Sequence, residues 1–130
     1  MVGIVLVSHS PKIAKGILEL ITQMAPNYEQ VVACGGTSEG EIGTDPAAIM
    51  TGIEQVNKGD GVVILVDIGS AIMSAEMALD LLEGDTLSNI IVADGPIVEG
   101  GLNAAVSASI GSCFEDVVAA IEDARTLSKL

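Results

Sequence analysis

Val2–Ser10 has the sequence Val-Gly-Ile-Val-Leu-Val-Ser-His-Ser, a nearly unbroken apolar run that ends at the only histidine of the 130-residue chain. A β-branched run of this kind predicts a strand buried on both faces, as in a parallel sheet flanked by helices. His9 then follows the carboxyl end of the strand, the edge at which open α/β sheets bind ligands. Ser10 and Pro11 are typical of a helix start, with Ser10 as N-cap and Pro11 at the first helical position. We therefore expect His9 beside a helix N-terminus, where backbone amides favour a phosphate or another anion.

Strands and helices alternate along the rest of the sequence. Further strands are predicted over Gln30–Cys34, Gly61–Val66 and Asn89–Ala93. The predicted helices are Pro11–Met24, a segment from Thr44-Asp45-Pro46 to Lys58-Gly59, Ala71–Glu83 closed by Gly84, Ile97–Ile110, and Phe114–Ser128. The alternation predicts a single domain, residues 1–130, of class α/β: a doubly wound, mainly parallel sheet in the order 2-1-3-4 with helices on both faces.

Apolar spacing predicts which helical residues face the sheet. In the first helix these are Ile13, Ile17, Leu20, Ile21 and Met24. In the third helix Ile72, Ala75, Met77, Leu79 and Leu82 surround much of the circumference, which predicts burial against more than one neighbour. Ser112 and Glu115 have the spacing of a capping box that opens the last helix, whose inward residues are Val117, Val118, Ile121 and Ala124.

The composition excludes several classes of function. The chain carries 5 Lys and Arg against 18 Asp and Glu, a net charge of −13 that disfavours binding to nucleic acid or to anionic membranes. Lys12 and Lys15 follow His9 closely, and either assist an acidic partner or phosphate or cover a solvated helix face. With neither a signal peptide nor an apolar run of membrane-spanning length, the sequence predicts a cytoplasmic protein. Cys34 and Cys113 are predicted to be ordinary buried thiols.

Asp67 ends the third predicted strand much as His9 ends the first. In the order 2-1-3-4 these two strands are adjacent, so the switch point of the sheet lies between His9 and Asp67. A carboxylate bound to one imidazole nitrogen leaves the other nitrogen free to attack, which makes His9 a competent phosphoryl acceptor. Candidate phosphate donors are the loop amides and hydroxyls of Ser10, Gly36, Thr37, Gly69 and Ser70. The alternatives are a surface histidine without a role and an Asp67 that only caps the third helix.

Other chemistries lack their motifs in this sequence. The serine-hydrolase elbow, the Gly-x-Gly-x-x-Gly fingerprint and the Walker A pattern are all missing, so no nucleotide cofactor is expected. One histidine without clustered cysteines also predicts no metal site.

Several motifs together resemble a known family. They are Gly3–Ser10, Ile13-Ala-Lys-Gly16, Cys34-Gly-Gly-Thr37 and especially Val66-Asp-Ile-Gly-Ser-Ala-Ile-Met-Ser-Ala-Glu-Met77. Nearly the whole chain resembles the phosphotransferase subunit of bacterial dihydroxyacetone kinase, which is related to the mannose-type enzyme IIA domains of the sugar phosphotransferase system. The resemblance implies a flavodoxin-like fold, a homodimer and a phosphohistidine relay. In that relay the phosphocarrier HPr phosphorylates His9, Asp67 orients the histidine, and the phosphoryl group passes to ADP held by the nucleotide-binding kinase subunit.

The sequence therefore predicts that His9 carries a phosphoryl group for dihydroxyacetone kinase, without a cofactor. One alternative is a mannose-type enzyme IIA that delivers the group to a sugar-transport IIB domain. A second alternative, from another class, is a non-catalytic regulatory module on the same fold.

Overall fold

A four-stranded parallel sheet forms the centre of the computed structural model, which describes residues 1–82 and 89–130. Its strands are β1 (Gly3–Ser8), β2 (Val31–Gly35), β3 (Val62–Val66) and β4 (Ile90–Val92). Their order is β2-β1-β3-β4, and every pairing is parallel. The predicted α/β class and strand order are confirmed, and the strand ends differ from the predicted ends by no more than a residue or two.

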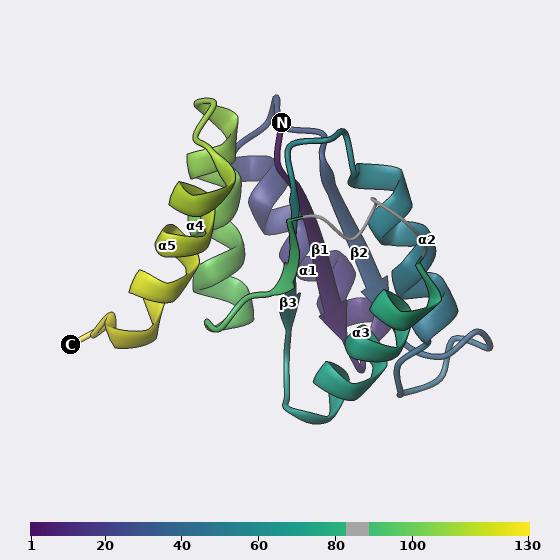
Figure 1. Cartoon of the computed structure of the whole chain (residues 1–130). Coiled ribbons are helices and arrows are strands. Elements are labelled where there is room, and N and C mark those ends of the chain that lie inside the picture. Colours follow the sequence, from purple (N-terminus) through teal and green to yellow (C-terminus); the bar gives the residue numbers. More distant parts are fainter. Residues whose placement is uncertain (83–88) are drawn as a thin grey trace.

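Helices cover both faces of the sheet (Figure 1). The helices are α1 (Pro11–Met24), α2 (Pro46–Val56), α3 (Ser70–Leu81), α4 (Ile97–Ser109) and α5 (Phe114–Asp123). Residues of α1, α4 and α5 share one apolar core with the sheet, and residues of α2 and α3 share the other. Helix α1 follows β1 and helix α3 follows β3, so these are the two helices next to the switch point. They belong to different cores and therefore lie on opposite faces of the sheet, as predicted.

Alternate residues of the central strands enter opposite cores. Ile4 and Leu6 of β1 belong to the core under α1, α4 and α5, whereas Val5 and Val7 belong to the core under α2 and α3. All six residues of β1 are buried. An uninterrupted apolar run is therefore required, since each face of the strand needs its own apolar side chains.

Two helices start as their sequences predict. The Ser10 hydroxyl accepts a hydrogen bond from the Ile13 amide at 3.3 Å, and Pro11 occupies the first turn of α1. The Asp45 carboxylate accepts from the Ala47 amide at 3.0 Å, and Pro46 begins α2. Both caps fix the entry of a helix into the carboxyl edge of the sheet.

The apolar faces predicted for α1 and α3 are only partly buried. In α1 the buried residues are Ala14, Ile17 and Ile21, while Ile13, Leu20 and Met24 are exposed. In α3 the buried residues are the three alanines Ala71, Ala75 and Ala78. Burial of α3 against more than one neighbour is confirmed, since the helix contacts α2 as well as β1, β3 and β4. Its buried residues are the small ones, however, and large ones such as Met77 are exposed.

The C-terminal segment differs more from the prediction. Helix α5 ends at Asp123 rather than Ser128, and Ala124–Thr126 tighten into a 3₁₀ turn in which Arg125 pairs with Asp94 at 3.1 Å. The capping box is wrong, since Cys113 is the N-cap residue and no side chain caps this helix. Cys113 is also exposed instead of buried, because it lies at this helix start, whereas Cys34 is buried as predicted.

Two remaining points concern the limits of the helices. Glu83 and Gly84, the predicted end of the third helix, lie outside the described residues. Within residues 1–82 and 89–130, no helix combines the length and apolar character needed to cross a membrane.

Candidate functional site

Strands β1 and β3 place His9 and Asp67 side by side. The strands pair in register up to Val7 and Val66, and the Asp67 amide donates to the Val7 carbonyl at 3.0 Å. The next residues of both strands therefore leave the sheet together at its carboxyl edge. The imidazole Nδ1 of His9 lies 2.9 Å from Oδ1 of Asp67, so side chains 58 residues apart are in direct contact.

Four hydrogen-bond donors surround the Asp67 carboxylate. Oδ1 accepts from the His9 Nδ1 at 2.9 Å and from the Ile68 amide at 2.8 Å. Oδ2 accepts from the His9 amide and from the Ser8 hydroxyl, each at 2.9 Å. Both oxygens are thus held in place, and the carboxylate binds the histidine through its ring and its backbone at once.

This environment keeps Asp67 ionised. Partial burial alone would raise its pKa, but the hydrogen bonds from His9, Ile68 and Ser8 outweigh burial and lower the pKa below its ordinary value. An ionised carboxylate accepts hydrogen bonds and donates none. The contact with His9 therefore places a proton on Nδ1.

The second imidazole nitrogen is consequently the one with a free electron pair. Nε2 lies 2.8 Å from the Ser70 hydroxyl, which donates to that pair. The His9 side chain is 21% exposed, so the ring is supported by protein on one side and accessible from solvent on the other. The geometry is that of an oriented nucleophile at the surface.

The start of α3 offers further donors beside Nε2. Gly69 is the N-cap of α3 and no side chain caps the helix. Among the described residues, the amides of Gly69 and Ser70 donate to no protein acceptor. Unpaired amides at a helix start favour an anion, so Gly69 and Ser70 are suited to contact a phosphoryl group on Nε2.

The other predicted phosphate donors form hydrogen bonds with other parts of the protein. The Gly36 amide donates to the Ser8 carbonyl at 3.2 Å, and the Thr37 amide donates to the Glu41 carbonyl at 2.9 Å. The Thr37 hydroxyl accepts from the Glu41 amide at 3.2 Å. The amides of Gly36 and Thr37 are therefore engaged in hydrogen bonds within the protein, and a contact of either residue with phosphate stays a prediction. Ser10 lies next to His9, but its amide donates to the Ser8 hydroxyl at 3.1 Å and its hydroxyl caps α1.

Sequence reasoning missed two residues that position the histidine, Ser8 and Gly43. Ser8 is fully buried, and its hydroxyl links Asp67 to the Ser10 amide. The Gly43 amide donates to the His9 carbonyl at 2.8 Å, which ties the loop after β2 to the site. A β-carbon on Gly35 would lie 2.6 Å from the Ser10 carbonyl oxygen, so only glycine lets α1 start this close to β2. A hydroxyl in an otherwise apolar strand was the available signal for Ser8.

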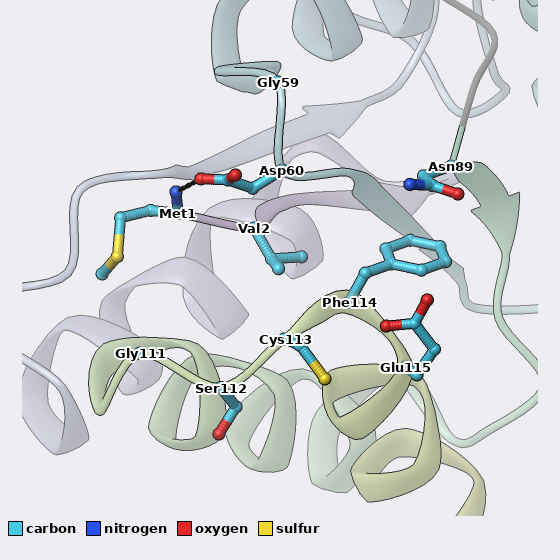
Figure 2. A pocket seen from close by; sticks show the side chains of 10 residues that line it. All are labelled: Met1, Val2, Gly59, Asp60, Asn89, Gly111, Ser112, Cys113, Phe114 and Glu115. Carbon is cyan, nitrogen blue, oxygen red and sulfur yellow. Dashed lines mark hydrogen bonds and ion pairs between the residues drawn. The ribbon is translucent and has the colours of Figure 1, made fainter.

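A hollow lies at the amino edge of the sheet, opposite to His9 and Asp67 (Figure 2). Its lining includes residues that precede β1, β3 and β4, namely Met1, Asp60 and Asn89, together with Cys113 and Phe114 at the start of α5. None of the predicted site residues lines it. In the described part of the chain, no cluster of His, Cys, Asp and Glu has the arrangement of a metal site.

Comparisons with known proteins give the family. The model of the EIIA-man family, described as the PTS system fructose IIA component, matches residues 3–118. The chain is 39% identical over 118 residues to the Listeria innocua PEP-dependent dihydroxyacetone kinase 2, phosphoryl donor subunit DhaM, covering 91% of this chain and 94% of that subunit. It is 38% identical to the Lactococcus lactis PTS-dependent dihydroxyacetone kinase, phosphotransferase subunit DhaM, covering 92% and 93%. The Klebsiella michiganensis DhaM is 42% identical, but the match covers 95% of this chain and only 26% of that longer protein.

Solved structures show the same fold. The crystal structure of EF1359, a protein of unknown function, superposes with a TM-score of 0.87 at 34% identity and covers 99% of this chain and 98% of that one. The phosphotransferase system component EIIA from Streptococcus agalactiae superposes with a TM-score of 0.69 at 20% identity, covering 96% and 92%. With a family model matched over most of its length and DhaM subunits aligned nearly end to end, the chain belongs to the EIIA-man family and, within it, to the DhaM group.

Proposed function

We propose that this protein carries a phosphoryl group for a phosphoenolpyruvate-dependent dihydroxyacetone kinase, with His9 as the covalent carrier. The observation that supports this most strongly is the arrangement of Asp67, His9 and Ser70. Asp67 holds the imidazole proton on Nδ1, which leaves the electron pair of Nε2 available as a nucleophile. Relatives that align with almost the whole chain are phosphoryl donor subunits of such kinases. A phosphotransfer role is therefore the one that both the geometry and the relatives support.

In the first step Nε2 of His9 attacks the phosphorus of a phosphorylated donor. The new Nε2–P bond forms while the bond from phosphorus to the donor nitrogen breaks, and its electron pair returns to the donor ring. The His9 ring gains positive charge as Nε2 gives up its pair. Asp67, held on Nδ1, stabilises that charge, and the Ser70 hydroxyl turns from Nε2 to the phosphoryl oxygens.

In the second step the phosphoryl group leaves His9 for a terminal phosphate oxygen of ADP. The Nε2–P bond breaks, its electron pair returns to Nε2, and the neutral ring bonded to Asp67 is restored. Little covalent chemistry is required of the protein, because phosphoryl transfer depends mainly on alignment and on stabilisation of charge. We propose HPr as the donor and ADP in the nucleotide-binding kinase subunit as the acceptor.

Labelling with phosphoenolpyruvate, enzyme I and HPr tests the carrier role. We expect one acid-labile phosphate per chain, lost in His9→Ala, and formation of ATP when the labelled protein is mixed with the ADP-loaded kinase subunit. Absence of label in the wild-type protein would favour a non-catalytic module. Label that passes only to a sugar-specific IIB domain would favour a sugar-transport enzyme IIA, the role suggested by the description of the family model.

Two further proposals concern the state of the protein in the cell. We propose a homodimer, which the resemblance implies and which the exposed apolar residues on α3 support by offering surface for a protein contact. Sedimentation equilibrium at several concentrations tests it, and a monomer mass throughout would contradict it. We also propose a cytoplasmic location, testable by cell fractionation.

A further inference from the structure

A groove with a volume of about 750 Å³ lies next to His9 at the carboxyl edge of the sheet. One wall is the start of α1, with Ser10, Lys12 and Lys15, and the other is formed by Gly40–Ile42. Both walls are attached to the backbone around His9. Ser10 follows it directly, and the Gly43 amide donates to the His9 carbonyl at 2.8 Å. A ligand in this groove is therefore close to the backbone segment that carries the histidine.

The charge of the groove is opposite to that of the molecule. Lys12 and Lys15 are two of the 5 basic residues in a chain of net charge −13. They stand three residues apart on one exposed face of α1, so their ammonium groups can reach the same ligand. Neither forms an ion pair with any described residue, whereas Arg125 and Lys129 both do. Glu41 places one carboxylate on the opposite wall, which leaves a local excess of positive charge.

Among residues 1–82 and 89–130, the site around Nε2 provides no cation of its own. Its donors are the neutral hydroxyl of Ser70 and the amides of Gly69 and Ser70, and its charged side chain is the Asp67 carboxylate. A phosphohistidine and a nucleoside diphosphate are both anions, and at close range their repulsion raises the barrier to transfer. Cations beside the reacting phosphates offset that repulsion.

We propose that Lys12 and Lys15 bind the phosphates of the nucleoside diphosphate that receives the phosphoryl group from His9. The inference rests on the proposed function, since it concerns the acceptor of that same transfer. The two lysines contact the nucleotide while the partner subunit holds it, and they align its terminal phosphate with the phosphohistidine. Their role is electrostatic and does not include proton transfer.

The test compares binding to the kinase subunit with and without ADP. Lys12→Gln combined with Lys15→Gln removes both charges but keeps polar side chains of similar length, and Lys58→Gln at the opposite edge of the sheet is the matched control. We expect the double variant to lose about tenfold in affinity for the ADP-loaded subunit, the size expected of two partly exposed charge pairs. Its affinity for the nucleotide-free subunit stays at the wild-type value, and transfer to ADP slows by a similar factor.

Each outcome decides the assignment. Equal losses for the loaded and the empty subunit mean that the lysines contact carboxylates of the partner, which overturns the proposal, and so does an unchanged affinity in both states. Lysine-dependent transfer to free ADP, without the partner, supports a groove that binds the diphosphate directly. If the wild-type phosphoprotein transfers nothing to ADP in any form, the proposed function fails, while the binding comparison still reports on the lysines.

Discussion

At the scale of single residues, the site depends on how completely Asp67 is hydrogen-bonded. Its two oxygens accept four bonds, three of which come from the Ser8–His9 segment. Neither oxygen can be exchanged for an amino group without turning one donor toward another. The residue therefore fixes the ring, its tautomer and the adjacent backbone together.

We predict that Asp67→Asn slows phosphorylation of His9 by on the order of 10²–10⁴-fold, the range found when a histidine loses an orienting carboxylate. The asparagine amino group would face donors such as the His9 or Ile68 amide, and the ring would lose its negative partner. Rapid-quench labelling from phosphorylated HPr measures the rate. Asp94→Asn is the control, because Asp94 contacts Arg125 and not the histidine. A wild-type rate in Asp67→Asn would exclude the orienting role.

Tyr28 provides a second residue-scale prediction, on pH. Burial, and to a smaller extent the nearby Asp60 charge, raise the pKa of Tyr28 from 10.0 to about 12, and its hydroxyl donates to the Val2 carbonyl. The folded state therefore binds the phenol proton more tightly than the unfolded state. The corresponding stability is fully present below pH 10 and is lost as the pH rises toward 12.

This titration can be observed directly, because Tyr28 is the only tyrosine and the chain has no tryptophan. We expect the near-ultraviolet absorbance of phenolate to appear with a midpoint close to 12 in the native protein. Tyr28→Phe should show no such signal, and its unfolding free energy should decline less between pH 10 and 12. A native midpoint near 10 would mean that the phenol is not held as described.

At the scale of elements, α3 packs against α2 and the sheet through small residues. Ala71, Ala75 and Ala78 are completely buried, while Met73 and Met77 on the outer side are 69% and 56% exposed. The helix therefore lies close to the sheet, which brings its N-terminus, and with it Ser70, against the imidazole. The spacing between this helix and the sheet is part of the geometry of the site.

We predict that Ala75→Leu destabilises the protein by about 1–3 kcal/mol, because a close-packed core has no room for three more carbon atoms. The larger side chain should also displace the start of α3 and slow labelling of His9. Urea denaturation measures the first effect, with Met77→Leu as an exposed control of similar helix propensity that changes stability by less than about 0.5 kcal/mol. Equal stability of Ala75→Leu and wild type would show that this helix is loosely packed.

The sequence predicts the existence of these helices better than the face they bury. Apolar periodicity correctly identified α1 and α3, but it counted Leu20 and Met77 as inward, whereas both are exposed and the buried residues of α3 are alanines. Periodicity measures where apolar residues lie on a helix and not how near the helix comes to the sheet. The end of α5 escaped prediction for a related reason, since Arg125 there bonds Asp94, a partner distant in sequence.

At the scale of the whole molecule, the sheet order and the pairing of His9 with Asp67 followed from two apolar runs and a rule about parallel sheets. The loop after β2 could not be predicted in the same way. It reaches the site through backbone bonds, such as that from Gly43 to His9, and backbone groups are the same in every residue. Only a folded chain shows which of them meet.

The molecule as a whole is strongly acidic, and its charges are mostly unpaired. Its 18 acidic residues face only 5 basic ones, and in the described residues the salt bridges between charged groups involve Asp60, Asp94, Glu99 and Glu122. Self-repulsion of this kind destabilises a compact state and is screened by salt. Exposed carboxylates such as Glu19 and Glu54 contribute to it without a compensating partner among those residues.

We therefore predict that the melting temperature rises as sodium chloride increases from about 0.01 M to about 0.15 M, where the screening length shortens from about 30 Å to about 8 Å. A gain of about 1 kcal/mol corresponds to about 4 °C in a domain of this size. Calorimetry of the wild type and of Glu19→Gln combined with Glu54→Gln measures it. The variant should melt higher at low salt and respond less to added salt, since it has less repulsion to screen. A melting temperature that falls with salt would show instead that ion pairs outweigh repulsion in this fold.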